Sequence, residues 1–160
     1  MIQRIQSVFL LFVIAGMVIY LFLPFWEKLD PVTGTHVMFT PFLISQTSNV
    51  NPEPVVAYFP YILCGIGAVI VIIVGAIEIF SYKNRMTQIK LGLANSILMS
   101  LILFFSAWLA LKAQKNFMPD IKGDFKLGLF APVVAMIFNS LANRFIKKDE
   151  EKVRAADRLR

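Results

Sequence analysis

The chain has 160 residues, 58% of them hydrophobic, and a formal net charge of +6 at pH 7. That apolar share is well above the roughly 45–50% of soluble globular proteins, which excludes an ordinary water-soluble domain. A single cysteine, Cys64, excludes an internal disulfide framework, and with a single histidine, His36, the chain is not expected to build a zinc site. The sequence therefore predicts no metal and no cofactor.

Four apolar runs dominate the chain, at residues 8–26, 58–82, 91–111 and 127–145. A hydrocarbon core ~30 Å thick needs ~20 mostly apolar residues of helix, and each run meets that length. Together the four runs contain two charged residues, Glu78 and Arg144. We therefore expect an all-α membrane protein: a four-transmembrane-helix bundle over residues 1–145, with an extended or short-hairpin outer loop at 27–57 and a cytoplasmic helical tail at 146–160.

The distribution of Lys and Arg predicts the orientation in the membrane. Ten of them lie in the N-terminus, the loop 83–90 and the tail, against five in the loops 27–57 and 112–126. Segments rich in Lys and Arg near span ends usually stay in the cytoplasm. Both termini are therefore predicted to be cytoplasmic. The first run is longer than the apolar part of a signal peptide, so we expect it to remain as an anchor.

The outer loop 27–57 contains prolines that argue against a helix, namely Pro31, Pro41, Pro52 and Pro54. Residues 35–40 and 42–44 are rich in strand-forming side chains, which favours a short hairpin or an extended flap. Its apolar side chains have two alternative roles: they cap the outer end of the bundle, or they contact another protein. The second outer loop, 112–126, is expected to be a simple connector.

Several polar residues share the cytoplasmic third of the bilayer when the spans are aligned by depth, at ~1.5 Å rise per residue. They are Glu78, Asn95, Asn139, Asn143 and Arg144, with Gln3, Arg4 and Gln6 at a similar depth. Polar side chains in lipid usually face the bundle interior and pair with one another. We expect one cluster, in which Glu78 accepts hydrogen bonds from Arg144, Arg4 or the Asn amides. Two interpretations stay open: a structural link between helices, or a proton or ion relay through Glu78.

The tail 146–160 is expected to continue the fourth span as a helix. Opposite charges recur at helical spacing, as in Lys147 and Glu151, and such pairs contribute roughly 0.2–0.5 kcal/mol each. The tail is either a solvated extension or a docking helix for a cytoplasmic partner. The candidate docking residues are Lys147, Lys148, Glu151, Arg154, Arg158, Leu159 and Arg160. Interleaved acidic residues make nucleic acid the weaker candidate as a partner.

No catalytic signature occurs in the sequence. There is no GxGxxG, no Walker loop, no HExxH, no Gly-x-Ser-x-Gly and no Cys/His metal spacing. The middle of each span consists mainly of Ile, Val, Leu and Phe. We therefore do not expect an enzyme.

Residues 1–8 (MIQRIQSV) and 146–160 (IKKDEEKVRAADRLR), together with the four-span layout, resemble the domain-of-unknown-function family numbered 4293. The resemblance extends over the whole chain. It implies a small inner-membrane protein of Bacteroidota bacteria. It implies no reaction and assigns no catalytic residue.

The sequence favours a non-catalytic inner-membrane protein that serves as an accessory or scaffolding subunit of a larger complex, in protein export, envelope assembly or respiration. Its contact surfaces would be the tail and the outer loop, and its partners the lipid bilayer, other membrane subunits and a cytoplasmic protein. The alternative is a small transporter or channel component that works through Glu78 and its polar neighbours.

Overall fold

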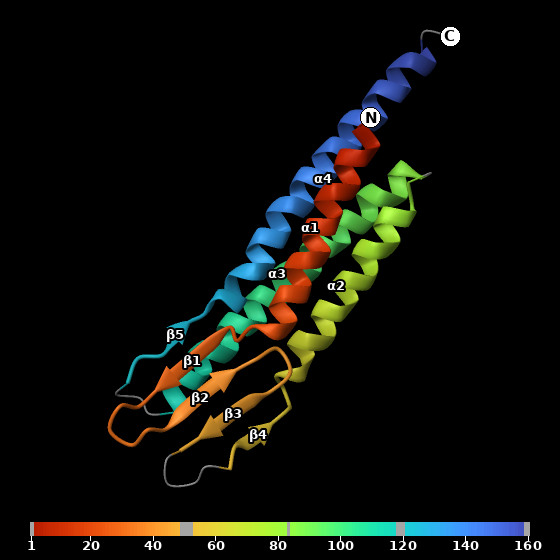
Figure 1. Cartoon of the computed structure of the whole chain (residues 1–160). Helices are drawn as coiled ribbons and strands as arrows, with labels where there is room; N and C mark the ends of the chain where they lie inside the picture. The colour runs from red at the N-terminus through yellow and green to blue at the C-terminus, as the bar shows by residue number, and fades with distance from the viewer. Residues whose placement is uncertain (1, 49–52, 83, 118–120, 159–160) are drawn as a thin grey trace.

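The computed structural model describes residues 2–48, 53–82, 84–117 and 121–158. Four long helices run side by side: α1 (Ile2–Phe22), α2 (Ile62–Phe80), α3 (Arg85–Asn116) and α4 (Leu127–Arg158). Figure 1 shows both termini at one end of these helices and the β-strands at the other. Around the bundle α1 contacts α2 and α4, and α3 contacts the same two helices, so α1 and α3 lie diagonally opposite.

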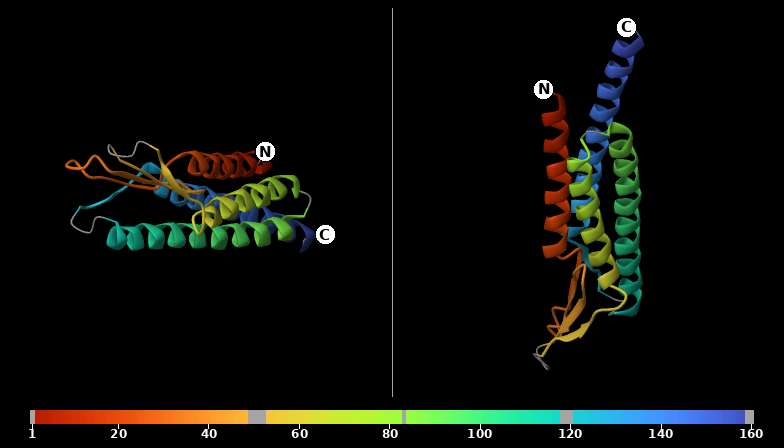
Figure 2. Two further views of the ribbon diagram at one scale, coloured as in Figure 1. Left: turned by 90° about the horizontal axis from the view of Figure 1, so that it is seen from below. Right: turned by 90° about the vertical axis from the view of Figure 1, so that its right-hand side faces the viewer.

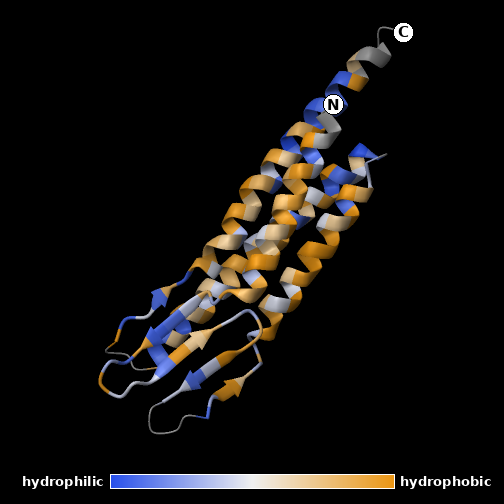
Figure 3. Cartoon of the chain, in the orientation of Figure 1, coloured by the Kyte–Doolittle hydropathy of each residue, from blue (hydrophilic) through white to orange (hydrophobic). Residues whose placement is uncertain are grey.

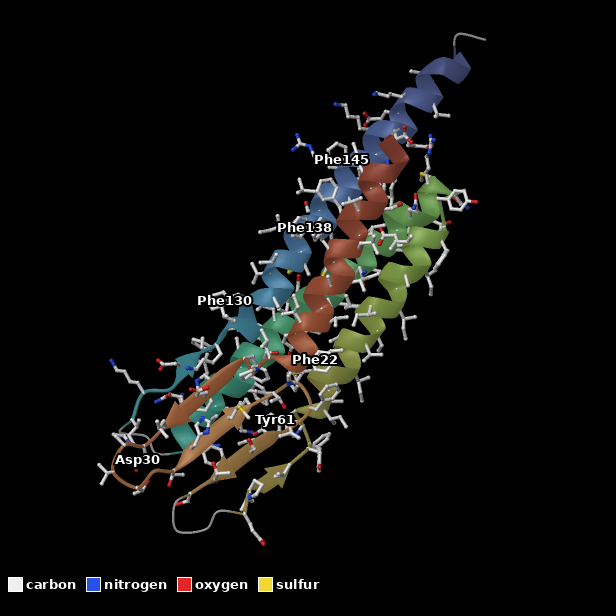
Figure 4. The ribbon with its side chains drawn as sticks, viewed as in Figure 1. Phe22, Asp30, Tyr61, Phe130, Phe138 and Phe145 are labelled. Atoms are coloured by element: carbon white, nitrogen blue, oxygen red, sulfur yellow. The ribbon has the colours of Figure 1, made fainter. Side chains whose placement is uncertain are left out.

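Small residues allow the helices to approach closely. A Cβ atom on Gly16 would lie 3.3 Å from the Cβ of Ala135, and one on Gly75 would lie 3.3 Å from a side-chain carbon of Ile14. Aromatic side chains fill the rest of the α1–α4 boundary. Phe9 stacks on Phe138 and Phe145, with ring centroids 6.2 and 5.5 Å apart, and Figure 4 shows both α4 rings beside α1. Small residues at helix contacts let the backbones approach closely, and this is a common feature of membrane helix bundles.

The all-α prediction is wrong, because the chain also forms a five-stranded antiparallel sheet. The strands are β1 (Trp26–Leu29), β2 (His36–Phe39), β3 (Ile44–Thr47), β4 (Val55–Ala57) and β5 (Asp124–Phe125), in the order β4-β3-β2-β1-β5. Pro31, Pro41 and Pro54 fall between strands, where a missing N–H does not interrupt a ladder. The second outer loop is not a simple connector either, since it supplies β5, which pairs with Trp26 and Glu27.

The sheet covers the end of the bundle and packs on the C-terminal part of α3. Trp26, Val37 and Phe39 alternate inward along β1 and β2 and join one buried core with Leu109 and Ala110 of α3. The strands are therefore held by a helix surface and by their own ladder, which explains how segments of two to four residues become ordered.

All four helices are long and apolar enough to cross a membrane, with candidate spans at Ile5–Phe22, Ile62–Phe80, Arg85–Asn116 and Leu127–Val153. Only 28% of the first apolar window and 33% of each of the others is buried inside the protein, so most of this apolar surface points outward. Figure 3 shows apolar residues along the sides of the helices, and more polar ones on β1 and β5 and towards the C-terminus. This distribution is compatible with a location in a membrane.

The helix boundaries differ from the expected spans. The third helix begins at Arg85 instead of residue 91, because the side chain of Asn84 caps it by accepting a hydrogen bond from the Thr87 backbone N–H at 3.3 Å. The first helix ends at Phe22, so Trp26, which was expected at the end of the first span, lies in β1. The fourth helix continues as far as Arg158, through the segment where the sequence also led us to expect helix.

Candidate functional site

Buried polar side chains gather between the helices, in the half of the bundle nearer the two termini. Every helix contributes at least one residue. We call the set the inner polar cluster: Gln6 of α1, Glu78 of α2, Gln88 and Asn95 of α3, and Asn139 and Asn143 of α4. All except the half-buried Asn143 are at most 4% exposed, so neither water nor lipid reaches them from outside.

Two sets of hydrogen bonds hold the frame of this cluster. The Gln88 amide donates to the backbone carbonyl of Glu78 at 2.9 Å, which joins α3 to α2. The Asn139 amide donates to the carbonyl of Gly92 at 2.7 Å and to the Ser96 hydroxyl at 2.8 Å, which joins α4 to α3. Because both donor contacts of Asn139 lie on α3, its amide orientation is fixed and its oxygen faces elsewhere.

Close packing places the remaining members next to one another. A Cβ on Gly75 would lie 3.6 Å from Nδ2 of Asn95, and Glu78 follows Gly75 by three residues on the same face of α2. The side-chain amide of Asn143 occupies the space that a Cβ atom on Gly92 would need. The Glu78 carboxylate and the asparagine amides therefore converge within one to two helical turns.

Several atoms of the cluster are buried without a hydrogen-bond partner among the described residues. They are both carboxylate oxygens of Glu78, Nδ2 and Oδ1 of Asn95, Oδ1 of Asn139 and Asn143, and Nε2 of Gln6. A buried polar group without a partner is costly, and a buried carboxylate most of all. The cluster is thus a polar pocket whose hydrogen-bonding capacity is only partly used within the chain.

The structure brings four of the predicted residues together and separates the fifth. Arg144 is exposed, because it follows the inward-facing Asn143 by one residue and points about 100° away around the helix. The expected hydrogen bonds to Glu78 from Arg144 or from the asparagine amides are absent among the described residues. The side chain of Arg4 lies outside the described residues.

Sequence reasoning missed Gln88, since residues 83–90 were assigned to a loop and a loop glutamine carries no signal. It also missed a second buried polar contact at the opposite end of the bundle. There the Tyr20 hydroxyl lies 2.7 Å from that of Ser106, which in turn contacts Sγ of Cys64 at 3.6 Å. This trio ties α1, α3 and α2 together and uses its polar atoms internally, so it is a structural contact. The position of Tyr20 on the same helical face as Val13 and Met17 was the available signal.

The predicted docking tail is the end of α4. The guanidinium of Arg85 pairs with the carboxylate of Asp149 at 3.0 Å and donates to its backbone carbonyl at 3.3 Å. Beyond Asp149 the helix extends past the other three, as Figures 1 and 2 show; we call residues 150–158 the projecting helix. Lys147, Lys148 and Glu151 are exposed. The side chains of Arg154 and Arg158, and residues Leu159 and Arg160 altogether, lie outside the described residues.

The sheet carries its own polar contacts. Glu27 of β1 accepts a hydrogen bond from the ammonium of Lys126 at 2.9 Å and lies 4.0 Å from Nε2 of His36. The hydrogen bond to Glu27 raises the pKa of Lys126. At the tip of the sheet, labelled in Figure 4, Asp30 accepts hydrogen bonds from the Thr33 hydroxyl and the Val32 N–H, which lower its pKa. These contacts order the β1–β2 turn and fix the start of α4 to the sheet.

No group of three or more His, Cys, Asp or Glu side chains in the described part of the chain could hold a metal ion.

The fold defines the class of the molecule: four helices of membrane-spanning length, closed at one end by a small antiparallel sheet. The family described as "Domain of unknown function (DUF4293)" matches residues 2–159, and the chain belongs to that family. This confirms the resemblance seen in its terminal segments. No curated protein matches the sequence.

Proposed function

We propose that the protein is a non-catalytic accessory subunit of a membrane complex, seated in a bacterial inner membrane with both termini in the cytoplasm. The observation that carries this proposal is the projecting helix. Nine residues of α4 follow Asp149, which at ~1.5 Å per residue is roughly 13 Å of helix beyond the Arg85–Asp149 ion pair.

The projecting helix has the features of a docking surface. A helix of so few residues is marginal in water by itself, and here it is preformed because it continues α4. Val153 is 41% exposed on it, among the exposed charged residues Lys148, Glu151 and Lys152. A preformed helix with apolar and charged side chains on its surface binds a partner at a lower ordering cost than a disordered tail would.

The sheet offers a second surface, which the orientation proposed above places on the outer side. Its edge strand β4 leaves Val55 and Val56 70% and 38% exposed, and its outward edge lacks a neighbouring strand in the described part of the chain. Exposed apolar side chains on an open edge strand favour pairing with another chain. A subunit with contact surfaces at both ends suits a role in holding a larger assembly together.

Site-specific photo-crosslinking in native cells tests the proposal. A photoreactive residue at Val153 should give a discrete adduct with one protein, while the same residue at Ile137, exposed on the apolar side of α4, should give none with that protein. A chain truncated after Asp149 keeps the Arg85 ion pair and should accumulate in the membrane without recruiting that protein. The same products from Val153 and from Ile137 would refute the docking role.

A further inference from the structure

Most of the atoms in the inner polar cluster that lack a hydrogen-bond partner are acceptors. Among the described residues, five of the seven are acceptors: two oxygens of Glu78 and one each of Asn95, Asn139 and Asn143. The two donors are Nδ2 of Asn95 and Nε2 of Gln6. These two amide nitrogens carry four N–H hydrogens between them, one fewer than the five acceptor oxygens, so rearranging hydrogen bonds within the cluster leaves at least one acceptor without a donor. What completes the cluster must bring positive charge or donors.

The acceptors approach from three helices. Asn95 packs at Gly75, one turn from Glu78 on the same face of α2. Asn139 and Asn143 lie one turn apart on α4 and contact α3 at Gly92, which precedes Asn95 by three residues. These contacts place Glu78, Asn95, Asn139 and Asn143 within one to two helical turns of one another, between α2, α3 and α4.

The charge of the cluster limits the ligand. Glu78 is completely buried and is its one ionisable member. The nearby cations that the structure describes are engaged or turned outward: Arg85 pairs with Asp149, while Lys90 and Arg144 are exposed. A neutral ligand would leave a buried negative charge, and a divalent ion would leave a surplus positive one, both of which are costly at low dielectric.

We propose that the inner polar cluster binds one small monovalent cation, with Glu78 as the anionic ligand and the amide oxygens of Asn95, Asn139 and Asn143 as neutral ligands. Carboxylate and carbonyl oxygens are the donors that hard cations take. A proton alone would neutralise Glu78 and add one O–H donor, whereas a cation would be coordinated by the carboxylate and the amide oxygens together. The docking role of the projecting helix does not depend on this site.

Thermal unfolding of the purified full-length chain in detergent, followed by circular dichroism, tests the site with Na⁺ as the probe. Sodium chloride should raise the unfolding midpoint relative to choline chloride at equal ionic strength, because a ligand that binds only the folded state stabilises it. Glu78→Gln keeps the shape, loses the charge and should abolish the sodium effect. The matched control, Tyr20→Phe, perturbs the buried contact at the other end and should keep it. The same midpoint in both salts, or a sodium effect that survives in Glu78→Gln, would overturn the proposal.

A second measurement needs no variant and stays informative if Glu78→Gln does not fold. A hydrophobic carbodiimide adds to a protonated carboxyl group in an apolar site, and the proton moves to a carbodiimide nitrogen. Intact-protein mass spectrometry should show labelling at Glu78 that slows about tenfold when Na⁺ exceeds its dissociation constant about tenfold. Labelling at an equal rate in sodium and choline would show that a proton alone occupies the site and would overturn the proposal.

Discussion

The Tyr20–Ser106 hydrogen bond should make a measurable contribution to stability. Both hydroxyl groups are fully buried and their oxygens are 2.7 Å apart, between diagonally opposite helices. Tyr20→Phe removes the bond, keeps the ring that stacks on Phe25, and leaves Ser106 only the weak sulfur contact at 3.6 Å. Interhelical hydrogen bonds in membrane proteins average ~0.6 kcal/mol and reach ~1.7. The Tyr20–Ser106 bond is short, and its removal leaves the Ser106 hydroxyl buried. We therefore place its contribution in the upper half of that range and expect Tyr20→Phe to lower the free energy of unfolding by about 1–1.5 kcal/mol.

A double-mutant cycle separates this bond from side effects of each substitution. Ser106→Ala should cost a similar amount, and the double variant should cost little more than either single one, giving a coupling energy of about 1 kcal/mol. The assay is reversible unfolding by a denaturing detergent, with helix content as the readout. If the double variant loses the sum of the two single losses, the hydroxyls do not act on each other and the reasoning is refuted.

Other substitutions test separate contacts. Gly92→Ala should lower stability by about 1–3 kcal/mol in the same assay, since the new methyl group meets the Asn143 amide; adding Asn143→Ala should recover most of the loss, and no recovery would contradict the packing argument. Arg85→Gln should change the global free energy of unfolding by less than about 1 kcal/mol but should speed amide hydrogen exchange in the projecting helix. Unchanged exchange there would mean that the Arg85–Asp149 ion pair does not stabilise the start of the projecting helix. Thr33→Val should raise the pKa of Asp30 measured by NMR. Because the pKa of Asp30 is lowered in the folded protein, this carboxylate stabilises the fold above its unfolded-state pKa of ~3.9. That stabilisation is lost as the pH falls through the folded-state pKa. An unshifted Asp30 pKa in the variant would exclude the Thr33 hydrogen bond as the cause.

The helices were predictable because each contains an apolar stretch of membrane-spanning length, which hydropathy alone detects. Their ends depend on local chemistry that hydropathy does not register. Asn84 starts α3 earlier than the apolar run begins, and charged residues keep α4 helical well past the end of its own run. Composition alone thus locates a span but leaves its ends open by a turn or more.

The five-stranded sheet could not be predicted from hydropathy and composition. Residues 35–40 and 42–44 did contain the strand-forming side chains of β2 and the start of β3. What the sequence could not show is that β5, two residues long, pairs with β1 from across two intervening helices. Such a short strand has no pattern of its own, and it becomes ordered only through its partner and through the packing beside it.

The polar site was predictable in depth but not in detail. Counting residues along each span placed Glu78, Asn95, Asn139 and Asn143 at a common level, and the structure brings them together. Partners within that level depend on rotation about each helix axis, which differs by about 100° between neighbouring residues. Arg144 faces away from the cluster for that reason.

The length of α4 has a mechanical consequence. This helix has 32 residues, or about 48 Å, and starts two positions after β5. The sheet therefore lies next to the first residues of α4, and the projecting helix forms its last residues. A rotation or tilt imposed at one end of α4 would be passed along the helix towards the other, so the positions of a partner at the sheet and of a partner at the C-terminal end would be coupled.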